Sequence, residues 1–331
     1  MAGEWTHGTM NEPALIASVR SDDATSADRS VEIVERVIAW FEANQRPFPW
    51  RDPDCSAWGI LVSEVMSQQT QMSRVEPKWR EFMELWPTPA AMAEAPVAEV
   101  IRRWDRLGYP RRAVNLHRCA VAIVAEHGGS VPSDRDALLA LPAIGAYTSA
   151  AVASFAFLRR EPVVDTNVRR VLARAIHGEA VAWPANSKRD EREMLALLPE
   201  DPARAKLWNA GAMELGAVKC QSKKPLCEAC PIAELCTWRE RDYPAATEKP
   251  RVQAKFEGSD RQLRGRVMAV LREHPDGVVF ADLPEFVEAS GVPAASGTVD
   301  VAHANRTLQL AEDLVRDGLA QRDGSRIRLP H

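Results

Sequence analysis

The chain has 331 residues and a formal net charge of −4, with 46% hydrophobic and 27% charged residues. This length and composition are typical of a globular protein with two or three compact units, and the charge argues against a generic polybasic protein that coats DNA. The chain opens without a secretory leader and has no apolar run approaching the about 20 residues of a membrane helix, so we expect a cytoplasmic protein with no membrane partner.

Amphipathic helical patterns dominate the chain up to about residue 240. Residues 1–28 are polar and show no periodicity, which predicts a disordered tail. From Val31 onward, apolar residues recur at three- and four-residue steps, and Pro/Gly turns separate the segments. Convincing alternating strands are absent through residue 240, so the sequence predicts an all-α core.

The pattern changes after residue 238. Residues 239–255 read as a linker, with prolines and charges and no periodicity. Residues 256–331 combine helical patterns with a short apolar piece, GVVF, and end in a turn flanked by extended residues. We therefore expect a small α+β, winged-helix-like C-terminal domain.

Four of the six cysteines lie close together, at Cys220, Cys227, Cys230 and Cys236. Four thiolates from one loop can hold either a tetrahedral zinc ion or an iron–sulfur cluster, and ligand type alone does not separate the two. The two isolated cysteines are expected to be ordinary buried thiols.

The segment Leu141-Pro142-Ala143-Ile144-Gly145 stands directly before a small-residue helical pattern. Taken alone, such a segment is more often a simple helix–helix turn. The alternative is a turn whose backbone N–H groups, with the start of the following helix, bind a phosphate. A left-handed residue at position 143 would favour glycine over alanine, so we expect a slightly altered turn.

Together these segments resemble the endonuclease III and MutY superfamily of DNA glycosylases. The spacing in KCQSKKPLCEACPIAELC is similar to that superfamily's loop for a 4Fe-4S cluster, and LPAIG is similar to its helix-hairpin-helix turn. The resemblance spans about residues 31–238 and implies a two-lobed core over 29–238. The barrel lobe would cover about 52–160, and the cluster lobe about 29–51 and 161–238.

The resemblance also implies two catalytic carboxylates, one on each side of a DNA cleft. Residues 58–71 are similar to the MutY stretch that carries the general acid, which places Glu64 in the role of protonating the adenine N7. Residues 163–172 resemble the catalytic aspartate loop, so Asp165 would stabilise an oxocarbenium-like sugar and Asn167 would orient Asp165. The alternatives are a surface glutamate and a helix N-cap, the second of which is compatible with catalysis.

Tyr147 takes the position at which bifunctional relatives carry a lysine that attacks C1′. Tyrosine cannot form a Schiff base, so the resemblance implies a monofunctional enzyme that removes the base without efficient strand cleavage. We expect the Tyr147 hydroxyl to position the sugar or Asp165.

Other matches to the family imply contacts with the duplex. Residues 68–70 would press into the duplex on the side of the orphaned base, which is the base left unpaired when adenine is flipped out. Residues 107 and 109 would act as wedges that keep the base stack open. Two arginines flanking PFPW would contact the base or its phosphate. The implied DNA-contacting residues are Arg46, Arg51, Gln68, Gln69, Thr70, Leu107, Tyr109, Ile144 and Gly145. Ala210 replaces a glutamate or glutamine of relatives, so one adenine contact is expected to be missing.

These observations predict a monomeric, nucleoid-associated adenine DNA glycosylase acting on double-stranded DNA with adenine opposite 8-oxoguanine or guanine. A thymine or uracil glycosylase for T·G mismatches is the nearest alternative. A non-catalytic Fe–S DNA-binding protein is another, and the presence of both Glu64 and Asp165 argues against it. Residues 256–331 are too few for the NUDIX-like domain that commonly detects 8-oxoguanine in MutY enzymes.

Overall fold

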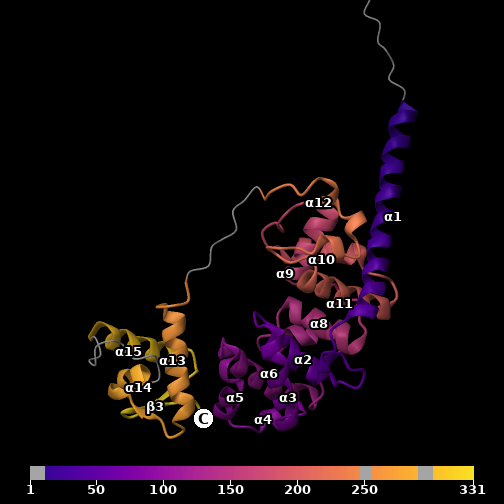
Figure 1. Ribbon diagram of the computed structural model, residues 1–331. Helices are drawn as coiled ribbons and strands as arrows, with labels where there is room; N and C mark the ends of the chain where they lie inside the picture. The colour runs from indigo at the N-terminus through magenta and orange to yellow at the C-terminus, as the bar shows by residue number, and fades with distance from the viewer. Residues whose placement is uncertain (1–11, 247–254, 290–300) are drawn as a thin grey trace, which may run out of the picture. The chain divides into compact units, whose positions relative to one another are not determined.

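The computed structural model describes residues 12–246, 255–289 and 301–331, with side chains from residue 28 onward (Figure 1). The chain divides into two compact units. Unit 1 comprises Met1–Arg46 and Leu158–Lys249, and unit 2 comprises Pro47–Phe157 and Pro250–His331.

All regular elements among the described residues of unit 1 are helices or helical turns, joined by loops. Its elements are α1 (Glu12–Asn44), α9 (Thr166–Leu172), the π-helical turn η3 (Ala173–His177), α10 (Ser187–Leu197), α11 (Pro202–Val218), the 3-10 turns η4 (Cys227–Ala229) and η5 (Ala233–Leu235), and α12 (Thr237–Glu240). Helix α11 packs against α1 and α9. The core between them includes Val37, Val171, Trp208 and Leu215, all at most 1% exposed.

Helix α1 corrects one expectation. It begins at Glu12, so residues 12–28 are helical where a disordered tail was predicted. The physical reason lies in the sequence, because no glycine or proline interrupts the chain between residues 14 and 46 and several alanines favour the helix. Residues 1–11 of the predicted tail lie outside the described residues.

The first part of unit 2 is also helical. Its elements are η1 (Pro49–Arg51), α2 (Ala57–Ser67), α3 (Met72–Leu85), α4 (Pro89–Ala93), α5 (Val97–Trp104), η2 (Asp105–Leu107), α6 (Arg111–His127), α7 (Arg135–Ala140) and α8 (Ala146–Phe157). Ser56 caps α2 by accepting a hydrogen bond from the Gly59 N–H, and residues 58–66 of that helix are all buried. Helix α2 is therefore central, and it packs against both α3 and α8.

The C-terminal part of unit 2 holds the small sheet. Its elements are α13 (Asp260–Glu273), β1 (Val278–Val279), η6 (Phe280–Asp282), α14 (Leu283–Ala289), α15 (Val301–Arg316), β2 (Gln321–Asp323) and β3 (Arg326–Arg328). Strand β3 lies between β1 and β2, antiparallel to both, with Val278 opposite Ile327 and Gln321 opposite Arg328. The helices and terminal hairpin follow the order predicted for a winged-helix-like domain, and the predicted fold class is confirmed.

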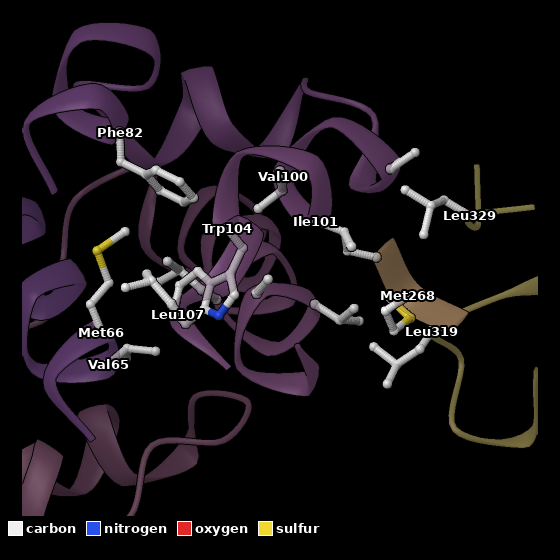
Figure 2. Close-up of a cluster of buried hydrophobic side chains, with 14 of the residues drawn as sticks. Val65, Met66, Phe82, Val100, Ile101, Trp104, Leu107, Met268, Leu319 and Leu329 are labelled. Atoms are coloured by element: carbon white, nitrogen blue, oxygen red, sulfur yellow. The ribbon is translucent and has the colours of Figure 1, made fainter. Parts of the chain in front are cut away.

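One buried cluster runs through unit 2 (Figure 2). Ile101 of α5 belongs to the same cluster as Met268, Leu319 and Leu329 of the C-terminal part, and each is at most 3% exposed. Within the described residues, no helix is both long and apolar enough to cross a membrane.

Candidate active site

The predicted hairpin connects α7 to α8. The Ile144 N–H donates to the Leu141 carbonyl at 3.2 Å, and α8 begins when the Ser149 N–H donates to the Gly145 carbonyl at 2.9 Å. Ala143 has φ 61°, so the turn keeps a left-handed residue even though no glycine is present, at a cost of about 1 kcal/mol. Ile144 is buried and Gly145 is exposed, which leaves the backbone of the turn, and not the Ile144 side chain, facing solvent.

Helices α2 and α8 bring Glu64 and Tyr147 together. Glu64 is only 7% exposed, and its Oε2 accepts a 2.9 Å hydrogen bond from the Tyr147 hydroxyl. One turn further along α2, the Gln68 amide donates to the Thr148 hydroxyl at 3.3 Å. The two helices are thus joined by polar contacts on the face that carries the predicted acid, and the interpretation of Glu64 as a surface residue is wrong.

Asp165 lies at the start of α9 in unit 1. Its Oδ1 accepts from the Val168 N–H at 2.7 Å, which is the expected N-cap contact, and its Oδ2 accepts from the Asn167 amide at 2.7 Å. Burial raises the pKa of the Asp165 carboxyl, while the hydrogen bonds from Val168 and Asn167 oppose that rise. Asn167 therefore stabilises the ionised form, in agreement with its predicted orienting role.

A second layer of contacts fixes Asn167. Its side-chain oxygen accepts from Arg170 Nη2 at 2.8 Å, and the same guanidinium donates to the Gly216 carbonyl at 2.7 Å and, through Nε, to the Cys220 carbonyl at 2.6 Å. Gly216 of α11 lies so close to α9 that an added Cβ would stand 2.7 Å from the Asn167 Cβ. Asp165 is thus connected through Asn167 and Arg170 to the first cysteine of the cluster loop.

The four clustered cysteines line one hollow in unit 1. Its empty space is about 410 Å³, part of it open to solvent, and Arg174, Leu215 and Trp238 are among the other residues that line it. Arg174 is buried, and its Nη1 donates to the Cys220 Sγ at 3.5 Å. Burial raises the pKa of the Cys230 thiol to about 11, so that thiol must lose its proton before it can ligate a metal.

The described residues contain no group of three or more His, Cys, Asp or Glu side chains arranged to hold a metal ion. Four thiols around one hollow form a donor set that suits either a zinc ion or an iron–sulfur cluster, and the Arg174 guanidinium is directed at the Cys220 sulfur.

Two arginines predicted to contact DNA have protein partners. Arg46 forms a bidentate pair with Glu214 of α11, with Nε and Nη2 at 2.6 and 2.9 Å from its carboxylate oxygens, and the Glu214 side chain is only 2% exposed. The Arg51 guanidinium lies over the Phe48 ring at 5.1 Å.

Comparison with known proteins decides the family. The sequence model for HhH-GPD superfamily base excision DNA repair proteins matches residues 62–195. An adenine DNA glycosylase of Mycolicibacterium smegmatis is 51% identical over 254 residues, covering 77% of this chain and 85% of that protein. One of Mycobacterium tuberculosis, strain CDC 1551 / Oshkosh, is 44% identical over 296 residues, covering 89% and 92%.

This chain belongs to the adenine DNA glycosylase family. A solved thermostable thymine-DNA glycosylase shares the fold with a TM-score of 0.59 and 28% identity, covering 65% of this chain and 98% of that chain. The family expected from the motifs is therefore confirmed.

The loops that the adenine DNA glycosylase resemblance assigns to DNA differ in exposure. Gln69 is exposed with φ 53°, and Tyr109 is 45% exposed with φ 48°. Leu107 is only 4% exposed and belongs to the buried cluster of Figure 2, so its expected wedge role does not fit this structure. Thr70 is half-buried, and its hydroxyl contacts the Leu107 carbonyl at 3.4 Å.

Several residues that hold the predicted site residues in place within each unit were missed by sequence reasoning. Asn209 accepts from the Val163 N–H at 3.1 Å and donates to the Glu161 carbonyl at 2.9 Å, which secures the segment before Asp165. Arg112, Arg170 and Glu214 were missed because their partners are distant in the sequence. The only available signal was a charged residue among apolar neighbours on a helical pattern.

Proposed function

We propose that this chain is a monofunctional glycosylase that hydrolyses the N-glycosidic bond of adenine mispaired with 8-oxoguanine or guanine in duplex DNA. The observation that carries the proposal is the buried Glu64 carboxyl with the Tyr147 hydroxyl hydrogen-bonded to it. A carboxyl in that setting is suited to proton transfer, and a tyrosine in the lysine position removes the amine needed for a Schiff base.

In the proposed reaction, Glu64 gives its proton to N7 of the extruded adenine. The C1′–N9 bond then breaks with its electron pair passing to the base, and the Asp165 carboxylate stabilises the positive charge on the sugar. Water adds its hydroxyl group to C1′, and its remaining proton returns to Glu64. The products are free adenine and an abasic site in an intact strand.

Asp165 must be ionised to stabilise that charge. Burial opposes ionisation, and the hydrogen bonds from Asn167 and the Val168 N–H favour it. The pKa stays raised on balance, so these hydrogen bonds limit the effect of burial and hold the carboxylate in a fixed orientation. Arg170 contributes by holding the Asn167 amide with its nitrogen directed at Asp165.

We further propose that Cys220, Cys227, Cys230 and Cys236 hold a 4Fe-4S cluster. The support is the four-thiol donor set around one hollow, with Arg174 directed at Cys220. When bound, the cluster would tie together the loop after α11, whose first cysteine, Cys220, accepts a hydrogen bond from Arg170 through its carbonyl. The chain's own residues carry the glycosylase reaction.

We propose that Gln69 and Tyr109 enter the duplex, because their side chains are exposed on the two loops of unit 2 that the family resemblance assigns to DNA. The exposed hairpin backbone around Gly145 would bind a phosphate. Discrimination of 8-oxoguanine would depend on the residues of these loops.

A thymine glycosylase for T·G mismatches is the second candidate, favoured by the shared fold of the solved thymine-DNA glycosylase. The test is to incubate the purified protein with duplexes containing A·8-oxoguanine, A·G, T·G and U·G, followed by alkali. Alkali-dependent cleavage at adenine is expected. Cleavage of the T·G duplex alone would favour the second candidate, and equal cleavage without alkali would contradict the monofunctional assignment.

A further inference from the structure

Arg112 lies in the first turn of α6 and is a buried cation. The hydrogen bonds described here go to carbonyl and hydroxyl oxygens, and none of these acceptors is a carboxylate. Arg112 is 9% exposed, and burial lowers the pKa of its guanidinium to about 10, so it stays charged at neutral pH. Nη1 lies 3.1, 3.0 and 2.6 Å from the carbonyls of Val65, Met66 and Gln68. Nη2 lies 3.0 Å from the Thr70 hydroxyl and 3.2 and 3.0 Å from the carbonyls of Leu107 and Gly108.

These six oxygens come from two segments that are far apart in the sequence. The first segment begins at Val65, directly after Glu64, and runs through the end of α2 to Thr70. The other is the loop between α5 and α6. The guanidinium therefore binds the last carbonyls of the helix that carries the proposed acid and joins that helix end to a second loop. A planar fork with several donors is suited to this, whereas a lysine ammonium offers three donors from a single point.

Both segments contain backbone that needs such support. Gln69 has φ 53°, and in the second loop Asp105 and Tyr109 have φ 47° and 48°. Left-handed conformations cost about 1–2 kcal/mol for residues other than glycine and persist only where surrounding contacts fix them. The guanidinium also lies 5.2 Å from the Trp104 ring and 5.5 Å from the Tyr109 ring.

Gln69 and Tyr109 are exposed residues of the two segments, while Leu107 and Arg112 are buried. We propose that Arg112 is a positioning residue that locks the Gln69 loop and the Tyr109 loop into one rigid body, so that both side chains enter the DNA duplex together. The proposal rests on the proposed function in assuming that these loops meet DNA. A purely structural cation would stabilise the fold without affecting one class of substrate more than another.

The test compares Arg112→Lys with Arg80→Lys, which makes the same chemical change at an exposed arginine of α3 that pairs with Glu76. Two duplexes are used, one fully paired except for a single A·G mismatch and one with the adenine inside a short unpaired stretch where the stack is already open. For Arg112→Lys we expect single-turnover excision to fall about ten- to hundredfold on the first duplex and about twofold or less on the second. Equal losses on both duplexes, or no loss on either, would overturn the proposal.

Hydrogen exchange gives a second readout that does not depend on activity. Amides of residues 67–72 and 105–109 are expected to exchange faster in Arg112→Lys, with the rest of unit 2 unchanged, and neither loop should change in Arg80→Lys. Faster exchange in only one loop, or throughout the unit, would contradict joint positioning. If the wild type removes adenine from neither duplex, the proposed function fails and the exchange result alone decides the role of Arg112.

A variant that does not fold would not end the test. Thr70→Val removes the one side-chain oxygen among the six acceptors and leaves the charge in place. It is expected to raise exchange in both loops to a smaller degree and to lower excision on the stacked duplex more than on the open one. Unchanged exchange in both loops would count against the proposal.

Discussion

The Tyr147 hydroxyl donates a 2.9 Å hydrogen bond to Glu64 Oε2, so the residue that replaces a catalytic lysine is in direct contact with the proposed acid. Sequence reasoning expected this hydroxyl to position the sugar or Asp165. The structure instead places it on the carboxyl of Glu64, within unit 2. The two residues belong to α2 and α8, and each helix is held in the buried core of that unit.

Removing this hydroxyl should slow the reaction without harming the fold. Tyr147→Phe keeps the ring and removes the hydroxyl that donates to Glu64, and a hydrogen bond to an ionisable group contributes about 1.5–3 kcal/mol. We expect single-turnover adenine excision to fall about ten- to hundredfold, with little change in the melting temperature. Wild-type rates in this variant would show that the contact has no part in catalysis.

Glu64→Gln tests the acid itself. Glutamine keeps the shape of the side chain but has no acidic proton to transfer, so adenine release should fall by about 10²- to 10⁴-fold. Glu76→Gln, at a more exposed position on α3, is the matched control and should keep its activity. Excision of thymine from a T·G duplex does not need N7 protonation, so a variant impaired equally on both bases would argue against the assigned role.

Asn167→Ala should move the acid limb of the pH–rate profile. Burial raises the pKa of Asp165, and the Asn167 amide opposes this by bonding to the carboxylate, so its loss should raise the pKa further. Because the reaction needs ionised Asp165, the rising limb should shift to higher pH in single-turnover measurements. A shift to lower pH would contradict the proposed role of Asn167.

The raised pKa of Asp165 also affects the stability of the fold. Its effect on the pH dependence is opposite to that of the lowered pKa of a salt-bridged aspartate. A folded-state pKa above the ordinary 3.8 means that the folded protein holds this proton more tightly than the unfolded chain does. The contribution of Asp165 to the free energy of unfolding is therefore fully present below that ordinary value and is lost as pH rises through the folded-state pKa.

Gly216→Ala tests the packing behind Asn167. The new methyl would lie 2.7 Å from the Asn167 Cβ and 2.8 Å from its backbone oxygen, neither of which can move without shifting α9. We expect a loss of about 1–3 kcal/mol in the free energy of unfolding together with impaired excision. Gly265→Ala in α13 is the control, since nothing lies within 4 Å of the added Cβ, and it should be neutral or stabilising.

Cys230→Ser tests the cluster proposal. Loss of one of four thiolates should reduce bound iron and the visible absorption of the purified protein, and it should lower the melting temperature. Cys119→Ala is a useful comparison, because Cys119 is buried in unit 2 and takes no part in the cluster loop. Zinc in place of iron in the wild-type protein would contradict the proposal.

Local features of the site followed from the sequence. Asp165 was expected at a helix N-cap and stands there, and the Pro/Gly turns correctly separated the helical segments. Long-range features did not follow. Arg112 contacts oxygens of residues 65–70, more than forty positions away, and no local pattern predicts which carbonyls a buried guanidinium will meet.

The sequence also did not predict which side chains of the loops are buried and which are exposed. Leu107 and Tyr109 stand two positions apart in one motif, yet the first is buried and the second is exposed. Gly108 and Tyr109 both have positive φ, a local backbone conformation that helical periodicity does not describe. The pairing of Arg46 with the distant Glu214 could not be anticipated either, and the predicted contact of Arg46 with DNA stays a prediction.

The most direct test of the account is to detect the released base itself. Wild-type protein and Glu64→Gln are each incubated with a duplex carrying one A·8-oxoguanine pair, and free adenine and strand integrity are measured in the same sample without alkali. We predict that the wild type releases one adenine per duplex and leaves the strand intact, while Glu64→Gln releases almost none. Equal release by both proteins, or a cut strand at the rate of adenine release, would contradict the account.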